Sequence, residues 1–195
     1  MNTTQTKIKK RCAWVTNDPL YIKYHDEEWG IPNRDDLKMF EFLILESAQA
    51  GLSWIIILRK RENYRKSFLN FDPKKIAQFK KKDIARLLKN PGIIRNKKKI
   101  EAAVNNAKIF LKIKKEFGSF SKYIWNFIKN KPIHHKIKQL SDYPKFTKEA
   151  ETISLDLKKR GFKFMGPSIV YAHMQALGMV NDHMAGCFKK INLKL

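Results

Sequence analysis

Apolar residues recur at intervals of three and four along most of the chain, which is the spacing of one face of an α-helix. The longest example covers residues 96–117, where Ile100, Val104, Ala107 and Leu111 share an apolar face. The same spacing, with capping residues beside it, predicts further helices over residues 36–50, 53–69, 73–79, 83–89, 120–129, 148–160 and 167–177. No segment shows the alternating pattern of a β-strand. The pattern therefore predicts an all-α protein.

The chain divides into three parts by composition. Residues 1–10 are polar and then basic, so we expect a disordered basic arm. Residues 11–190 carry the helical pattern and are expected to form one compact all-α domain of two lobes, with residues 191–195 as a tail. No apolar run reaches the roughly 20 residues of a membrane span, and the start of the chain lacks the hydrophobic stretch of a signal peptide. We therefore expect a cytoplasmic protein without membrane contact, and we also expect it to be a monomer.

The chain is strongly basic. It contains 41 Lys and Arg residues against 18 Asp and Glu residues, a formal net charge of +23. The excess runs from Lys7 to Lys194 without a separate acidic domain. A charge of this size indicates a polyanionic partner such as DNA or RNA. A coding bias toward A and T, which enriches Lys, is the alternative explanation.

Four residues have the chemistry of a metal site. Cys12 and Cys187 stand at opposite ends of the chain, and in a reducing compartment they do not indicate a disulfide. His183 precedes Cys187 by four residues, so both side chains fall on one face of a helical turn. With Cys12 and His25 they would form a closed, tetrahedral site of the structural kind. Two free thiols and two ordinary histidines are the alternative.

A glycine turn near residues 83–100 joins two predicted helices. Asn90, Pro91 and Gly92 form the turn, and Arg95 and Lys97 begin a run of cations behind it. Backbone N–H groups beside Gly92, together with the N-terminus of the following helix, would bind a phosphate. Such contacts recognise the nucleic-acid backbone and not the base sequence. The alternative is a plain turn between helices, beside a solvated Lys run.

A second corner joins two predicted helices near residue 51. Glu46 and Gln49 precede Gly51, which ends the first helix, and Ser53 is expected to cap the helix that starts with Trp54. Glu46 thus stands near a helix C-terminus, where the macrodipole disfavours negative charge. A carboxylate, an amide and an indole around one corner predict a pocket for a flat, hydrogen-bonding, electron-poor ligand. The alternative is a surface Glu beside a core Trp.

Three aromatic residues upstream could complete this pocket. Trp14, Tyr21 and Tyr24 supply stacking faces, and an extruded base is held by stacking together with hydrogen bonds. An aromatic core is the alternative, because Trp is usually buried in large part.

Several multi-residue motifs in one order resemble those of 3-methyladenine DNA glycosylase I, a constitutive bacterial family of helix-hairpin-helix type. The similarity runs from about Arg11 to Cys187. In sequence letters, it is carried by CxW from Cys12, DPLYIxYHDxEWG from Asp18, LExxQAGLSW from Leu45, KRENYR from Lys60, GIIR from Gly92, KKRGFKF from Lys158 and VNDHxxGC from Val180.

The resemblance implies a DNA-repair hydrolase with a helix-hairpin-helix glycosylase fold. Such an enzyme flips the damaged nucleotide out of alkylated double-stranded DNA and hydrolyses the N-glycosidic bond, with 3-methyladenine as the product. The resemblance also implies that one structural zinc ion joins the N- and C-terminal segments, on Cys12, His25, His183 and Cys187.

The resemblance further assigns a role to each residue of the predicted pocket and hairpin. Glu46 would recognise the base and act as the catalytic carboxylate. The other base-binding residues would be Trp14, Tyr21, Tyr24, Gln49 and Trp54. The residues that contact DNA would be Leu52, as a wedge that fills the gap in the duplex, and Gly92, Ile93, Arg95 and Lys97.

One feature of many related glycosylases is missing from this sequence. The stretch from Lys97 to Lys122 contains no Asp that could serve as a catalytic carboxylate, and no lysine stands out as a Schiff-base nucleophile. We therefore predict a monofunctional hydrolase without strand cleavage. The competing interpretations are a DNA-binding protein without catalysis and a relative that acts on another alkylated base or on RNA.

Overall fold

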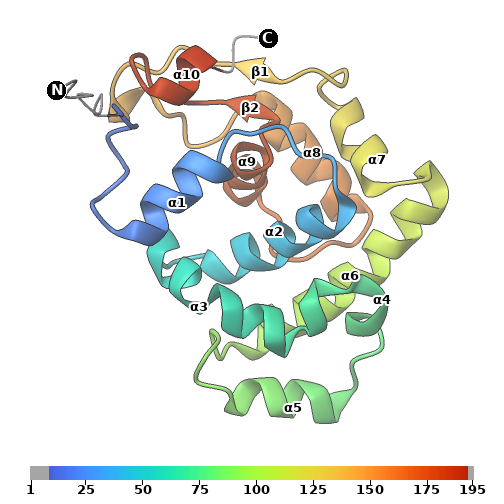
Figure 1. The fold of residues 1–195 in the computed structure, drawn as a ribbon. Helices are drawn as coiled ribbons and strands as arrows, with labels where there is room; N and C mark the ends of the chain where they lie inside the picture. Colours follow the sequence, from blue (N-terminus) through green and yellow to red (C-terminus); the bar gives the residue numbers. More distant parts are fainter. Residues whose placement is uncertain (1–8, 193–195) are drawn as a thin grey trace, which may run out of the picture.

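The computed structural model describes residues 9–192, which form a mainly helical protein (Figure 1). Residues 1–8 of the expected arm and 193–195 of the expected tail lie outside the described residues. None of the described helices has the length and apolar character needed to cross a membrane. In chain order the elements are α1 (Pro19–Glu27), α2 (Asp36–Gln49), α3 (Trp54–Ser67), η1 (Leu69–Phe71), α4 (Pro73–Ile76), α5 (Lys81–Lys89), α6 (Lys97–Phe117), α7 (Phe120–Asn126), β1 (Ile133–His134), η2 (Leu140–Asp142), α8 (Lys148–Lys159), α9 (Pro167–Ala176), β2 (Val180–Asn181) and α10 (Phe188–Asn192).

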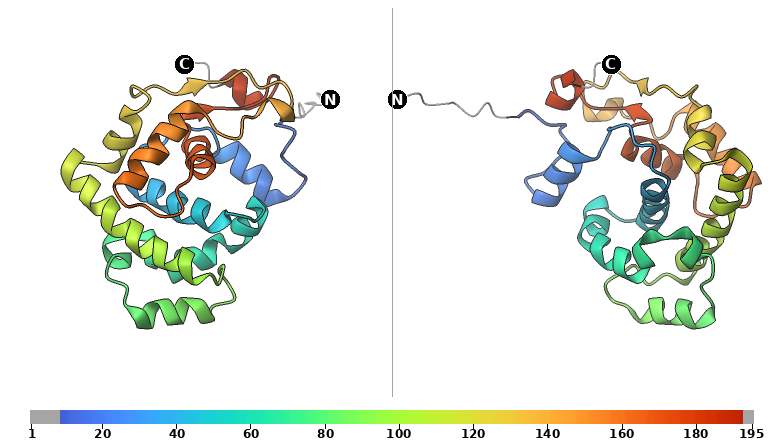
Figure 2. Two further views of the ribbon diagram at one scale, coloured as in Figure 1. Left: turned by 180° about the vertical axis from the view of Figure 1, so that it is seen from behind. Right: turned by 45° about the vertical axis from the view of Figure 1, so that its right-hand side comes forward.

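The predicted helical fold class is confirmed, and helix α2 is its centre. Helices α3, α6, α7 and α9 all contact α2, which Figures 1 and 2 show enclosed by its neighbours. Residues 39–48 of α2 are all buried, whereas the sequence pattern indicated a single apolar face. This burial places the polar residues Glu41, Glu46 and Ser47 inside the protein, where each needs a partner or a function.

Two short strands join segments that are far apart in the sequence. Ile133 of β1 pairs with Val180 of β2 in parallel register, and Ile137 forms an isolated bridge to Met184. The sequence pattern did not reveal these strands, because two residues are too few to show an alternating pattern. The division into two lobes stays a prediction.

Several helix boundaries differ from their predicted positions, and two of these differences have a clear local reason. Helix α5 begins at Lys81 and not at Asp83, because the Asp83 carboxylate accepts the backbone N–H of Lys80 at 2.9 Å and so closes the first turn. Helix α7 ends at Asn126 and not at Lys129. Lys129 and Asn130 have φ angles of 54° and 62°, which a right-handed helix does not allow.

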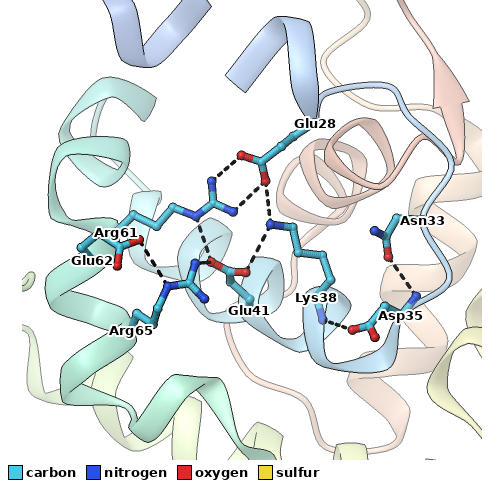
Figure 3. Close-up of polar contacts among 8 residues, drawn as sticks. All are labelled: Glu28, Asn33, Asp35, Lys38, Glu41, Arg61, Glu62 and Arg65. Carbon is cyan, nitrogen blue, oxygen red and sulfur yellow. Dashed lines mark hydrogen bonds and ion pairs between the residues drawn. The ribbon is translucent and has the colours of Figure 1, made fainter. Parts of the chain in front are cut away.

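A network of charged side chains holds α3 against α2 (Figure 3). Arg61 donates hydrogen bonds of 2.7 Å to both carboxylate oxygens of Glu28, which follows α1. Buried Glu41 of α2 accepts hydrogen bonds of 2.9 Å from both Arg61 and Arg65. Burial opposes the charge of Glu28, but hydrogen bonds from Arg61 and Lys38 hold its pKa at about 2. The paired, bidentate contacts fix the position of α3 relative to α2, and thus the corner between them.

Candidate active site and metal cluster

A cavity of about 390 Å³ lies beside the C-terminal part of α2. Its wall includes all the residues predicted to bind a base, which come from α1, α2, α3 and the segment before α1: Trp14, Tyr21, Tyr24, Glu46, Gln49 and Trp54. The structure thus brings these side chains together around one space. Their roles in binding stay predictions.

Helix α1 supplies aromatic residues to the cavity. The Asp18 carboxylate caps the helix by accepting the Leu20 N–H at 2.9 Å, and a proline occupies the first helical position. Tyr21 and Tyr24, three residues apart, then reach the same cavity. The Tyr24 ring is buried, and its centroid lies 5.4 Å from that of Trp54, with 51° between the planes.

Glu46 is the single acidic residue among the described residues that line this cavity. Glu46 is only 2% exposed, and its Oε2 atom has no hydrogen-bond partner within the described structure. Burial raises the pKa of Glu46 to about 8. A buried carboxyl with a free oxygen costs folding free energy, so its presence indicates a group that meets a ligand.

Hydrogen-bond donors accompany this carboxyl. The indole Nε1 atoms of Trp14 and Trp54 are buried and find no acceptor within the part of the chain that the structure describes. Burial, followed by the charge of Glu46, raises the pKa of Tyr24 well above its ordinary value, so its hydroxyl keeps the proton. The cavity therefore combines aromatic faces, N–H and O–H donors and one carboxyl, which suits a flat heterocycle.

The rest of the cavity wall was not predicted from the sequence. Tyr171 and Gln175 of this wall both donate hydrogen bonds to the Asp182 carboxylate, the second at 2.8 Å. Their spacing with Ser168 along one helix face is a signal from which this wall could have been found. The additional lining residues are Trp29, Leu140, Tyr143, Pro144, Lys145, Ser168, Tyr171, Ala172 and Gln175.

The four predicted metal ligands lie in one buried cluster. The ligand atoms of Cys12, His25, His183 and Cys187 are all within 4.8 Å of one another. The Cys187 Sγ atom lies 3.4 Å from His25 Nε2 and 3.7 Å from His183 Nδ1. Hydrogen bonding with Cys12, assisted by that with the two imidazoles, outweighs the opposing effect of burial and lowers the pKa of Cys187, which favours the thiolate that binds metals. Two thiols and two imidazoles at these distances can hold a metal ion tetrahedrally.

The outer nitrogen of each imidazole has its own partner. His25 Nδ1 lies 2.8 Å from the Asp26 carboxylate, and His183 Nε2 lies 3.2 Å from the Trp29 carbonyl oxygen. Each ring therefore turns its other nitrogen toward the thiols. Metal-binding histidines in proteins are oriented by such partners, so the surroundings as well as the four ligands fit a metal.

The turn between α2 and α3 is tight and partly exposed. Gly51 has a φ of 81°, a conformation that favours glycine, and the Leu52 N–H donates to the Gln49 carbonyl at 2.6 Å. Ser53 occupies the N-cap position of α3 as predicted, but its side chain makes no capping hydrogen bond. The apolar Leu52 is 36% exposed in this turn. Its role as a wedge stays a prediction.

The hairpin between α5 and α6 lies below α3 in the view of Figure 1 and is fastened to it. The Lys60 ammonium donates to the Pro91 carbonyl at 2.8 Å. The Ile94 N–H donates to the Tyr64 hydroxyl at 3.1 Å. The turn of the hairpin is thus held by the same helix that carries Trp54.

The predicted DNA-contacting residues of the hairpin differ in exposure. Gly92 is half-buried, and a Cβ atom there would lie 2.9 Å from Asn63 Cγ, so crowding and not a positive φ explains the glycine. Arg95 and Lys97 are exposed. Ile93 is only 2% exposed and packs in the core, so any contact that it makes with DNA comes from its backbone.

Residues 14–190 match the family model described as methyladenine glycosylase. The chain is 48% identical over 178 residues to DNA-3-methyladenine glycosylase 1 of Escherichia coli, covering 91% of this chain and 95% of that one. It is also 48% identical over 177 residues to DNA-3-methyladenine glycosylase of Haemophilus influenzae, covering 91% and 96% of the two chains.

Solved structures agree with these relatives. A crystal structure of 3-methyladenine DNA glycosylase I superimposes with a TM-score of 0.89 at 49% identity, covering 92% of this chain and 98% of that chain. The Staphylococcus aureus enzyme, whose structure concerns 3-methyladenine recognition, has a TM-score of 0.89 at 43% identity, covering 92% and 96% of the two chains. The chain belongs to the methyladenine glycosylase family.

Proposed function

We propose that this protein is a DNA-3-methyladenine glycosylase, which hydrolyses the N-glycosidic bond of 3-methyladenine in alkylated double-stranded DNA. The observation that carries the proposal is Glu46, a buried carboxyl with a free oxygen in an aromatic cavity. Family membership and two relatives named as DNA-3-methyladenine glycosylases support the same activity. One structural neighbour was solved in complex with 3-methyladenine, which supports the class of base.

The chemistry of the lesion explains why one carboxylate suffices. Methylation at N3 places a positive charge on the adenine ring of the nucleotide. When the bond between C1′ and N9 breaks, its electron pair moves to the ring and cancels that charge, while a water oxygen bonds to C1′ and releases a proton. The base is therefore a good leaving group and needs little acid catalysis.

Glu46 would act on this charge electrostatically. In the free protein, burial keeps the carboxyl largely protonated near neutral pH, since its pKa is raised to about 8. A cationic ring beside it favours the carboxylate, which then accepts hydrogen bonds from the base and stabilises the charged state. Unmodified adenine carries no such charge, so Glu46 discriminates against it.

The aromatic side chains would hold the flipped base. The cavity volume of about 390 Å³ lies in the range of small-ligand sites. Trp54 and Tyr24 face the same space and would stack on the ring and hydrogen-bond to it, with Trp14 and Tyr21 as the adjoining wall and Gln49 as a further polar contact.

DNA would bind across the α2–α3 turn and the hairpin between α5 and α6. Leu52 enters the gap that the flipped nucleotide leaves, and the hairpin binds the phosphate backbone through the N–H groups near Gly92 and Ile93 and through exposed Arg95 and Lys97. The net charge of +23 supports a polyanionic partner.

The metal in this proposal is zinc with a structural role. Two Cys and two His side chains match the ligand preference of zinc. Four protein ligands leave no open position for a substrate, so the ion joins the two ends of the domain and takes no part in the reaction.

The proposal includes a monomer in the cytoplasm. All the residues of the cavity and of the metal cluster come from one chain, so a second copy is not needed to complete either. Gel filtration of the protein with and without DNA tests the monomer.

Base release from methylated DNA tests the proposed function. Purified protein is incubated with duplex DNA treated with a methylating agent, and the released bases are separated by chromatography. We expect 3-methyladenine in the soluble fraction and intact strands in the duplex. Release of a different base, or action on methylated RNA alone, would change the substrate, and binding without release would leave a DNA-binding protein.

Strand cleavage is tested in the same reaction. Monofunctional hydrolysis leaves an abasic site, and borohydride traps no covalent complex between protein and DNA. Lys145 is the one lysine among the described residues of the cavity wall. A trapped complex that disappears in Lys145→Met would show that this amine acts as a nucleophile and that the reaction is not monofunctional.

A further inference from the structure

Lys99 connects the hairpin to the turn that carries Leu52. It stands in the first turn of α6, where its backbone N–H donates to the capping side chain of Asn96 at 3.2 Å. Its ammonium donates to the carbonyl oxygens of Ala48 at 2.9 Å and of Ala50 at 2.7 Å. These residues precede Lys99 by 51 and 49 positions. One side chain thus bonds the start of α6 to the end of α2.

These bonds have a clear local effect. The last carbonyl groups of a helix lack partners within it, and a cation at that end is favourable. Lys99 satisfies two such carbonyls and forms no ion pair with a carboxylate in the part of the chain that the structure describes. The Lys99 ammonium therefore interacts with the end of α2, whereas the neighbouring lysines on this surface are exposed to solvent.

The residues around Lys99 are closely packed. The space between α2, α3 and the beginning of α6 near Lys99 has a cavity of only about 10 Å³. Tyr64 and Ile94, which fasten the hairpin to α3, line the same space. A close-packed interior transmits a displacement to its neighbours, so we expect a shift at the start of α6 to move the end of α2.

We propose that Lys99 is a positioning residue that couples phosphate binding at the hairpin to the insertion of Leu52 and the placement of Glu46. Glu46 lies one helical turn before Ala50, whose carbonyl accepts from Lys99. A phosphate bound at the N-terminus of α6 is then held at a fixed distance from the α2–α3 turn. Leu52 thereby meets the base stack, and Glu46 meets the flipped ring. This inference rests on the proposed function.

Three variants separate this role from that of a general DNA-binding charge. Lys99→Met keeps the aliphatic stem and removes both hydrogen bonds. Lys99→Arg keeps a charged donor that can still reach the carbonyls. Lys98→Met is the matched control, because it removes one charge from the same helical turn while its exposed side chain makes no hydrogen bond to the α2–α3 turn.

The first readout reports wedge insertion without any base release. A duplex carries a stable abasic analogue and 2-aminopurine opposite to it, and fluorescence is recorded at saturating protein. Wild type, Lys98→Met and Lys99→Arg are expected to raise the fluorescence. In Lys99→Met and in Leu52→Ala the increase is expected to fall by about 5-fold or more, since a small displacement of a positioned group has a large effect.

The second readout is single-turnover excision at saturating methylated DNA. The rate for Lys99→Met is expected to fall about 10-fold or more relative to Lys98→Met, while the two variants bind DNA with similar Kd. A merely structural role would lower the melting temperature and leave the fluorescence at saturation unchanged. Should Lys99→Met melt below the assay temperature, Lys99→Gln, which is too short to reach both carbonyls, takes its place.

The outcomes distinguish the inference from the proposed function. If Lys99→Met raises the fluorescence and excises base as Lys98→Met does, the inference is overturned. If Lys99→Met loses excision but keeps the full fluorescence increase, coupling to Leu52 is likewise overturned. If wild type raises the fluorescence but releases no base, the proposed function fails while the role of Lys99 in wedge insertion is still decided by the first readout.

Discussion

The Cys12 Sγ atom lies 3.6 Å from His183 Nδ1, although 171 residues separate the two in the sequence. The contact joins the beginning and the end of the described chain. Asp182, the neighbour of His183, also accepts hydrogen bonds from Tyr171 and Gln175 in the cavity wall. A metal ion in the cluster would therefore support one wall of the proposed base pocket as well as the chain ends.

Removing one ligand of the cluster is expected to remove the metal and to destabilise the fold. Structural metal sites contribute directly to folding free energy. For Cys187→Ser we expect loss of bound zinc, and a cost of about 2–3 kcal/mol would lower the melting temperature by about 5–10 °C. Elemental analysis and calorimetry measure both. His134→Ala, at an exposed histidine outside the cluster, is the control. Full zinc content in Cys187→Ser would contradict the ligand assignment.

The raised pKa of Glu46 predicts a pH-dependent stability. The ordinary pKa of a Glu is 4.5, and burial raises that of Glu46 to about 8. The folded state therefore holds the proton more tightly than the unfolded state, so the contribution of Glu46 is fully present below pH 4.5 and is lost as the pH rises toward 8. Relative to that of wild type, the free energy of unfolding of Glu46→Gln is expected to increase by about 2–5 kcal/mol between pH 4 and pH 8. Urea unfolding at several pH values measures the difference, and a constant difference would show that the carboxyl is not buried in solution.

The ionisation of Glu46 is also expected to appear in the pH dependence of the reaction rate. Because kcat/KM reports groups of the free enzyme, it should rise with pH and level off near the pKa of Glu46, about 8. The residual activity of Glu46→Gln should lack this rise. A profile that is identical in wild type and variant would assign the ionisation to another group.

Gly92→Ala is expected to weaken DNA binding through crowding in the hairpin turn. The added Cβ would lie 2.9 Å from both Asn63 Cγ and Asn90 Oδ1, and the latter atom accepts the Gly92 N–H at 2.8 Å. Overpacking of this kind costs about 1–3 kcal/mol, which corresponds to an increase of about 5- to 150-fold in Kd if the cost falls on the DNA-bound geometry. Fluorescence anisotropy at fixed salt measures the Kd. Gly166→Ala, where nothing lies within 4 Å of the new Cβ, is the control. Equal Kd values for the two variants would show that the hairpin is not part of the DNA interface.

Local signals in the sequence predicted much of the fold. Helix α6 follows a regular apolar face and begins at a capping Asn96, and its observed limits agree closely with the prediction. The α2–α3 corner follows from Gly51. The four metal ligands could be proposed because thiols and imidazoles are rare in the chain and have a distinct chemistry.

Other features depend on tertiary packing and have no local signal. The burial of α2 on all sides arises from its neighbours, and it is this burial that makes Glu46 a shielded carboxyl and not a surface residue. The α9 wall with Tyr171 and Gln175 reaches the cavity because Asp182 holds both side chains. The bonds from Lys99 to the end of α2 join two segments whose proximity only the folded chain reveals.

The most direct test of the central claim is single-turnover release of 3-methyladenine by Glu46→Gln beside wild type. Loss of the carboxylate removes the stabilisation of the cationic ring, so the rate is expected to fall by about 10-fold or more, with zinc content and DNA affinity unchanged. Trp54→Ala should show a similar loss, since it removes a stacking face. Release of 3-methyladenine by Glu46→Gln at the wild-type rate would contradict the assignment of this cavity as the active site.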